Sequence, residues 1–295
     1  MSRRARARAA PAAIVCCLAL LAGCSDDAGS PSETDAGGTP ESESAQPTEG
    51  SDDFDGLVTI DDGRKLYLRC TGEGSPTVVL EGGDDDTSDS YGFAETTLAA
   101  VTRTCVYDRA NLGRSDPDER RRGLPELVSD LEQVLAAADV PEPYVLVGTS
   151  GGGYITAGYA FEHADRVAGM VFVEVPAPFR SPPPEIVEIT RWDAPENIES
   201  RDFLQVEKDA WAARREVGDI PVTVISNKYT DAEIAAAEFP SEARGMSANV
   251  REQRGWLVLS PRAEQVVVQT GHAVEEVDPQ LVIDAILEVV DAARA

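Results

Sequence analysis

The sequence is short of basic residues. Its 295 residues contain 26 Lys and Arg against 53 Asp and Glu, which gives a formal net charge of −27. A surface this negative repels nucleic acids and other anionic polymers, so the composition excludes a nucleic-acid partner. The charge either favours neutral or cationic substrates or reflects solubility in a salty habitat, and the second explanation is the simpler.

Residue groups that hold metals or cofactors are scarce as well. The chain has two His and five Cys, and none of them cluster at the spacing of a metal site. A glycine-rich dinucleotide fingerprint is absent, and the part expected to fold has no basic patch. We therefore expect neither a metal nor an organic cofactor.

The N-terminal apolar run, Ala9 to Ala22, is too short for a permanent membrane span. Four arginines precede it, a pattern typical of an export signal. The run ends at Leu21-Ala22-Gly23-Cys24, which resembles the bacterial lipobox, where cleavage precedes a lipidated Cys. We expect residues 1–23 to be a signal peptide, and Cys24 to anchor the exported protein at the outer face of the cell membrane by lipid alone.

Residues 24–53 consist mostly of Ser, Pro, Gly, Thr and acids, without Lys or Arg. Such a segment cannot bury enough apolar surface to fold, so it predicts a disordered tether. Residues 54–295 then form one domain, which is long enough to bury a substantial core. Cys70 and Cys105 are its only cysteines, and two cysteines in an exported domain predict one disulfide.

Short β-rich apolar runs alternate with helical stretches along this domain. Eight runs predict strands, beginning at Leu57, Lys65, Thr77, Thr104, Tyr144, Val167, Pro221 and Gln265. Amphipathic spacing predicts packing helices at Glu126–Ala138 and Pro279–Ala293. The alternation predicts an α/β class with a mostly parallel eight-stranded sheet flanked by helices. Residues 176–218, rich in Pro and then helical and charged, interrupt the pattern and predict a small lid.

A strand-to-helix turn carries the first chemical motif. Gly148-Thr149-Ser150-Gly151-Gly152 follows the apolar run YVLV and leads into a helical stretch, which is the context of a GxSxG nucleophile elbow. Glycine-rich turns that bind phosphate lack a Ser centred between glycines and usually carry a Lys. We therefore predict Ser150 as a nucleophile.

A Ser hydroxyl is a weak nucleophile and needs an adjacent base. His272 follows the last predicted strand, in a loop that can bring an imidazole over Ser150. His163 lies between the elbow helix and the next strand, and we expect it at the surface. The sequence therefore predicts His272 as the general base.

Acyl transfer also needs N–H donors directed at the developing oxyanion. The N–H of Gly151, directly after the nucleophile, is one candidate. The other is the N–H of Asp84, supported by the flexible Gly83, in the loop after the TVVLE strand. The alternative is that Asp84–Asp89 is an acidic turn without a role.

Together these motifs resemble the α/β-hydrolase superfamily from Leu57 onward. The matching segments are TVVLEGG, CVYDRANLGRSD, GTSGGGYITAGYAF and TGHAVEEVDPQ. The resemblance implies a chain order of Ser, acid and His, and it places the strands of Cys70 and Cys105 side by side. Two residues depart from the family pattern: Gly82 stands where a His is common, and Asn111 replaces a loop glycine. Because Asn tolerates positive φ, the second departure is mild.

Two carboxylates compete for the role of the acid. The family's commonest position follows the PVTVIS strand, where the first carboxylate is Asp231. The alternative is Glu174, at the end of the VAGMVFVEV strand, a position that some lipases of the superfamily use. A strand end holds a side chain more rigidly than a loop does, and a charge in an apolar strand needs a partner such as His272. We favour Glu174 and keep Asp231 as the alternative.

The resemblance implies a serine hydrolase that cleaves an ester, lactone, thioester or amide of a small acyl substrate through an acyl-enzyme. A Ser at the elbow distinguishes the sequence from dehalogenases and epoxide hydrolases, which place Asp there. Two alternatives share the same residues: a non-catalytic lipoprotein that binds a ligand or partner, and an acyltransferase. An intact Ser and His favour an enzyme.

Overall fold

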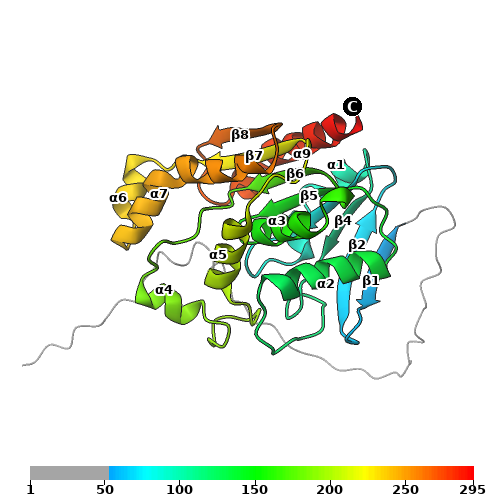
Figure 1. The fold of residues 1–295 in the computed structure, drawn as a ribbon, viewed down its shortest axis with the longest axis horizontal. Coiled ribbons are helices and arrows are strands. Elements are labelled where there is room, and N and C mark those ends of the chain that lie inside the picture. Colours follow the sequence, from blue (N-terminus) through cyan, green and yellow to red (C-terminus); the bar gives the residue numbers. More distant parts are fainter. Residues whose placement is uncertain (1–52) are drawn as a thin grey trace, which may run out of the picture.

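The computed structural model describes residues 53–295, and these form one eight-stranded sheet (Figure 1). The strands are β1 (Phe54–Thr59), β2 (Lys65–Thr71), β3 (Thr77–Glu81), β4 (Thr104–Tyr107), β5 (Tyr144–Thr149), β6 (Val167–Val173), β7 (Val222–Asn227) and β8 (Ala263–Val268). Their order is β1-β2-β4-β3-β5-β6-β7-β8. Only β2 pairs antiparallel with its neighbours, β1 and β4. The predicted fold class is confirmed, whereas the signal peptide, the lipobox and nearly all of the tether lie outside the described residues.

Helices cover both faces of the sheet. The described helices are α1 (Glu95–Ala99), α2 (Leu124–Ala137), α3 (Gly152–Glu162), α4 (Pro184–Ile189), α5 (Phe203–Ala213), α6 (Asp231–Ala236), α7 (Pro240–Gln253), α8 (Val274–Val277) and α9 (Pro279–Arg294). One buried cluster joins α2 and α3 to the sheet, and a second joins α1 and α9 to its other face. In the part of the chain that is described, no helix is both long and apolar enough to cross a membrane.

Two helical segments are inserted between strands of the C-terminal half of the sheet, one between β6 and β7 and one between β7 and β8. The predicted lid contains α4 and α5, and α5 packs against α2 and α3. Helices α6 and α7, which were not predicted from the sequence, lie between β7 and β8 at the left of Figure 1. Helix α7 packs against β7, and its Asn249 side chain donates to the carbonyl of Asn227, the last residue of that strand.

A disulfide joins β2 to β4. Cys70 and Cys105 face each other in the antiparallel register, are fully buried and are bonded. This confirms the predicted pairing. In the following loop, Asn111 has φ of 73°, as expected for a residue that takes the place of a glycine.

Candidate active site

Ser150 lies in a sharp turn between β5 and α3. Its φ of 45° is in the left-handed region, which is strained for a side chain of this type. The turn leaves little room for its neighbours: a Cβ built on Gly152 would lie 2.2 Å from the carbonyl oxygen of Gly82. The Ser150 N–H donates to the carbonyl of Val173 at 2.9 Å, which fixes the turn against β6. The geometry is that of a nucleophile elbow.

His272 reaches Ser150 from the loop between β8 and α8. Its Nε2 atom lies 2.9 Å from Ser150 Oγ, within hydrogen-bond distance. The loop is held by Asn227, whose Oδ1 atom accepts hydrogen bonds from the N–H groups of Thr270 at 3.0 Å and Gly271 at 3.1 Å. The side chain of Asn227 therefore holds the loop that carries the imidazole of His272.

His163 lies away from this pair, at the C-terminal end of α3. Its Nε2 atom is 3.5 Å from Glu132 Oε2, and its ring packs on the ring of Tyr159. These contacts are structural, which agrees with the expectation that His163 is not the base.

Glu174 directly follows β6, with 1% of its surface exposed and φ of 48°. Its Oε1 atom lies 3.8 Å from Nδ1 of His272, the ring nitrogen opposite the one that faces Ser150. The distance is beyond a hydrogen bond but within ion-pair range. The competing carboxylate, Asp231, is exposed at the start of α6. The structure thus pairs Glu174 with His272.

Four donors surround the Glu174 carboxylate. Oε1 accepts from Asn249 Nδ2 at 2.6 Å and from the Tyr229 hydroxyl at 3.4 Å. Oε2 accepts from the N–H of Asn227 at 2.6 Å and from Gln253 Nε2 at 2.9 Å. A buried carboxylate is costly unless such bonds replace its hydration. The set makes a charged Glu174 tolerable inside the protein and fixes the plane of its carboxylate.

The two donors that come from α7 were not predicted from the sequence. Asn249 and Gln253 are four residues apart, so they lie on the same face of the helix, and both are buried. Gln253 Nε2 also donates to Asn249 Oδ1 at 3.0 Å, so the two amides support each other. The sequence signal that could have identified them is a pair of amide side chains four residues apart in a polar helix.

The loop after β3 lies against the elbow. A Cβ built on Gly83 would be 3.5 Å from Ser150 Cβ, and one built on Gly151 would be 1.7 Å from Asp84 Oδ1. The Gly83 N–H donates to Asp86 Oδ2 at 2.9 Å. The N–H groups of Asp84 and Gly151, the predicted oxyanion donors, make no hydrogen bond within residues 53–295. The structure brings both residues together beside Ser150.

Acidic groups of this loop have raised pKa values. Burial, together with the nearby charge of Glu199, raises the pKa of Asp84 despite the opposing charge of Arg201. Burial and the charges of Glu199 and Asp84 raise the pKa of Asp85 to about 7. A carboxyl that is easily protonated repels a developing oxyanion less than a permanent carboxylate would.

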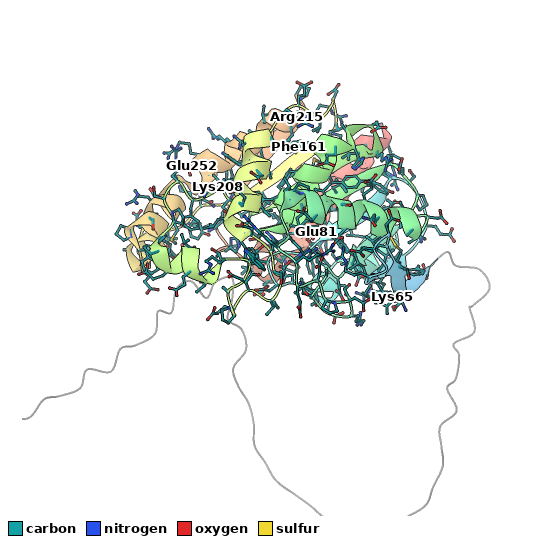
Figure 2. All side chains as sticks on the ribbon, turned by 60° about the horizontal axis from the view of Figure 1, so that its bottom comes forward. Lys65, Glu81, Phe161, Lys208, Arg215 and Glu252 are labelled. Atoms are coloured by element: carbon teal, nitrogen blue, oxygen red, sulfur yellow. A yellow bond between two sulfur atoms is a disulfide. The ribbon has the colours of Figure 1, made fainter. Side chains whose placement is uncertain are left out.

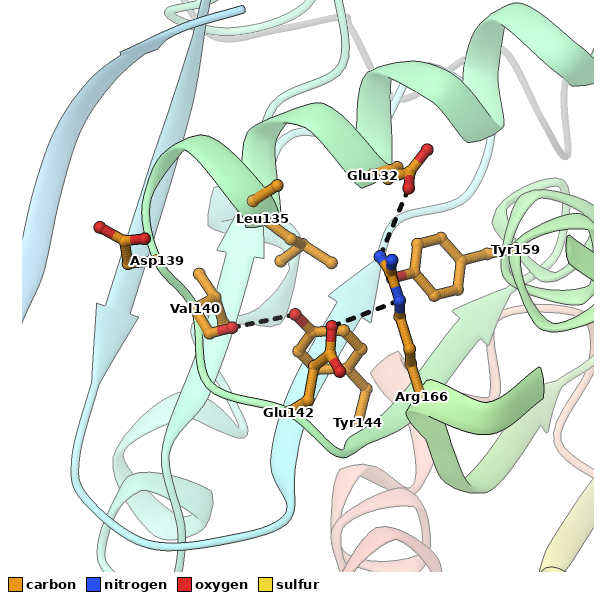
Figure 3. Close-up of a pocket in the computed structure, with 9 residues that line it drawn as sticks. Glu132, Leu135, Asp139, Val140, Glu142, Tyr144, Tyr159 and Arg166 are labelled. Carbon is orange, nitrogen blue, oxygen red and sulfur yellow. Dashed lines mark hydrogen bonds and ion pairs between the residues drawn. The ribbon is translucent and has the colours of Figure 1, made fainter. Parts of the chain in front are cut away.

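A separate pocket of about 380 Å³ opens at the opposite end of the strands (Figure 3). It lies where β5 begins, because Tyr144 lines it. Arg166 pairs with Glu132 at 3.3 Å and with Glu142 at 3.4 Å, and the Tyr144 hydroxyl donates to the Val140 carbonyl. Its polar side chains thus bind each other and include no activated nucleophile, so the candidate site remains the one at Ser150.

Comparisons with known proteins agree with this architecture. Residues 70–201 match the family model described as alpha/beta hydrolase fold. The uncharacterized protein YqjL of Bacillus subtilis is 25% identical over 223 residues, which are 74% of this chain and 85% of that protein. The chain spans less than half the length of four other curated relatives that it matches.

Solved structures with the same architecture include an esterase and a lactone-degrading enzyme. A thermophilic esterase from Thermogutta terrifontis superposes with a TM-score of 0.61 at 19% identity, covering 82% of this chain and all of that one. Est816, described as an N-acyl homoserine lactone degrading enzyme, gives 0.61 at 20% identity and covers 80% of this chain and all of its own. At these identities the likeness establishes the fold.

Proposed function

The chain has the α/β-hydrolase fold, and on that premise we propose that it is a serine hydrolase with Ser150 as its nucleophile. The observation that carries the proposal is the 2.9 Å contact between Ser150 Oγ and His272 Nε2 in a strained elbow. Strain at a turn persists only where surrounding structure enforces it, and it concentrates at functional sites. Glu174, behind the imidazole, supplies the third group of a Ser-His-acid triad.

The proposed reaction proceeds through an acyl-enzyme. His272 accepts the hydroxyl proton as Ser150 Oγ attacks the carbonyl carbon, and the charge of Glu174 stabilises the imidazolium. The N–H groups of Gly151 and Asp84 bind the oxyanion of the tetrahedral intermediate. The imidazolium returns its proton to the leaving group, and water then releases the acyl group by the same steps. Esters and lactones are the substrate classes favoured by the names of the two matching solved structures.

Covalent labelling tests the nucleophile directly. A fluorophosphonate probe should modify Ser150 in the wild type and should fail with Ser150→Ala, while His163→Ala, which leaves the site intact, should label normally. A panel of p-nitrophenyl esters, lactones and aminoacyl anilides then separates esterase from peptidase activity. Absence of both labelling and turnover would favour a non-catalytic binding protein. Acyl transfer to an added alcohol that exceeds hydrolysis would identify an acyltransferase.

We further propose export and lipid anchoring through Cys24, supported by the lipobox-like sequence that precedes an acidic segment. Two or three acyl chains would hold the protein stably at a membrane, whereas one chain binds only marginally. In detergent phase partitioning, wild type should enter the detergent phase and Cys24→Ala should remain aqueous. Aqueous partitioning of both would contradict the anchor.

A further inference from the structure

We propose that Glu199 and Arg201, both from the lid segment, are positioning residues that fix the oxyanion loop and the elbow, with Arg109 as the link between Glu199 and the loop. Both residues precede α5 and are fully buried. The inference rests on the proposed function, because it assigns a task in that same site.

Arg109 fixes the orientation of two peptide groups in the loop after β3. Its Nη1 atom donates to the carbonyl of Gly82 at 2.8 Å, and its Nη2 atom donates to the carbonyl of Gly83 at 2.6 Å. In a trans peptide unit the C=O and the following N–H point in opposite directions. Holding the carbonyl of Gly83 therefore sets the direction of the Asp84 N–H, the proposed oxyanion donor.

Buried carboxylates hold Arg109 in turn. Glu81, labelled near the centre of the molecule in Figure 2, lies 2.7 Å from Nη1. Glu199 accepts from Nε and from Nη2, both at 2.8 Å, which makes a bidentate pair. Such forks fix the plane of a guanidinium as well as its position. These pairs fix the guanidinium in the orientation in which it donates to the two carbonyls.

Glu199 also contacts the loop directly, because its Oε1 atom accepts from the N–H of Asp85 at 2.9 Å. Burial alone would raise the pKa of Glu199, but the charge and hydrogen bonds of Arg109, with the charge of Arg201, lower it to about 2. Glu199 is therefore charged throughout the pH range in which a serine hydrolase works. One lid carboxylate thus holds the loop at Asp85 and, through Arg109, at Gly82 and Gly83.

Arg201 contacts both the elbow and the oxyanion loop. Its Nη2 atom donates to the carbonyl of Gly151 at 3.2 Å and lies 2.9 Å from Asp84 Oδ1. The positive charge offsets a carboxylate that stands beside the elbow. Two lid residues therefore touch both segments that supply oxyanion donors.

The lid segment is itself fixed at this point. The N–H of Arg122 donates to the carbonyl of Ser200, and the N–H of Asp202 donates to the carbonyl of Arg122, each at 3.0 Å. The side chain of Asn111 donates to the carbonyl of Glu199 at 3.0 Å. Positioning demands a rigid support, and these bonds fasten residues 199–202 to the loop after β4.

The test compares Glu199→Gln with Glu95→Gln. Glu95, on α1, also makes a bidentate pair with an arginine, Arg69, so the same substitution removes a similar charge outside the site. Two readouts are used: kcat and KM on a p-nitrophenyl ester, and hydrogen–deuterium exchange of residues 82–86. We expect Glu199→Gln to lower kcat by about 10²-fold with little change in KM, as loss of an oxyanion donor does.

Exchange at residues 82–86 should accelerate in Glu199→Gln and remain unchanged in Glu95→Gln. Arg201→Lys, which keeps the charge but loses the planar fork, provides a second, milder variant and should lose less turnover than Arg201→Met.

Equal kcat or equal loop exchange in the two Glu→Gln variants would overturn the proposal. If the wild type neither labels nor hydrolyses any substrate, the proposed function fails by itself. The exchange comparison then decides alone: faster exchange only in Glu199→Gln supports the positioning role, and no difference refutes it.

Discussion

Ser150 and Glu174 follow neighbouring parallel strands, and both have φ near 45°, yet their side chains are held differently. The place of Ser150 follows from its own main chain and from adjacent glycines. The carboxylate of Glu174 depends on donors 53, 75 and 79 residues further along the chain. A nucleophile can thus be specified locally, whereas its supporting acid requires a distant helix.

The largest effect should come from the locally specified residue and its base. Ser150→Ala and His272→Ala should each remove nearly all turnover, by up to about 10⁶-fold, because triad members act as a unit. Neither change should unfold the protein, since each removes side-chain atoms without burying a new polar or charged group. Steady-state kinetics with thermal melting tests this. Substantial activity in His272→Ala would reject the assignment of the base.

The next effect concerns the acid. Glu174→Gln should lower kcat by about 10⁴-fold, because the amide keeps the shape but not the charge that stabilises the imidazolium. Asp231→Asn, at an exposed position, serves as the matched control and should be nearly silent. The reverse result would make Asp231 the acid, and the catalytic acid would then not depend on donors from α7.

A smaller effect should follow from removing a distant donor. Gln253→Leu removes one of the two donors to Glu174 Oε2 and leaves the N–H of Asn227 as the other. A misplaced catalytic group costs up to about 10²-fold in rate. Gln265→Leu is the control, because Gln265 donates to Ser226 and Val250 and not to Glu174.

A double variant shows whether the donor acts through the acid. If Gln253 works only through Glu174, its loss should cost almost nothing once Glu174→Gln is present, as measured by a double-mutant cycle. Fully additive losses would instead show that Gln253 acts independently of Glu174.

The smallest effect on turnover should come from the disulfide, which joins β2 to β4 and contacts neither the elbow nor the donors of Glu174. Its closed loop of 35 residues corresponds to roughly 3 to 4 kcal/mol of stability by the chain-entropy estimate. Reduction should therefore lower the melting temperature while kcat below the transition stays constant. The Cys70→Ala/Cys105→Ala protein should not respond to reductant, and a wild type with two free thiols before reduction would contradict the bond.

Much of the fold and part of the site could be predicted because the signals are local. Short β-rich apolar runs located all eight strands, and the GxSxG turn indicated the elbow from five consecutive residues. The disulfide required the strand order that the family resemblance supplied. Glu174 was favoured over Asp231 by a rule of burial, since an acid in an apolar strand needs a partner.

The supporting residues could not be predicted by the same means. Helix α7 is polar along most of its length, so it lacks the apolar stripe that identifies α2 and α9. Glu199 and Arg201 appear in the sequence as ordinary charged lid residues. Only tertiary structure shows that they are buried, because the partners that make their burial tolerable come from the loops after β3 and β4 and from the elbow.

The left-handed turn at Ser150 also restricts how this site could change its chemistry. A β-branched side chain is severely strained at positive φ, because its two γ atoms crowd the backbone. Threonine would therefore be excluded as a replacement nucleophile, although it carries the same hydroxyl. Cysteine, which is unbranched, would fit the turn. Evolution or design could thus exchange oxygen for sulfur at this position, but it could not exchange a primary alcohol for a secondary one.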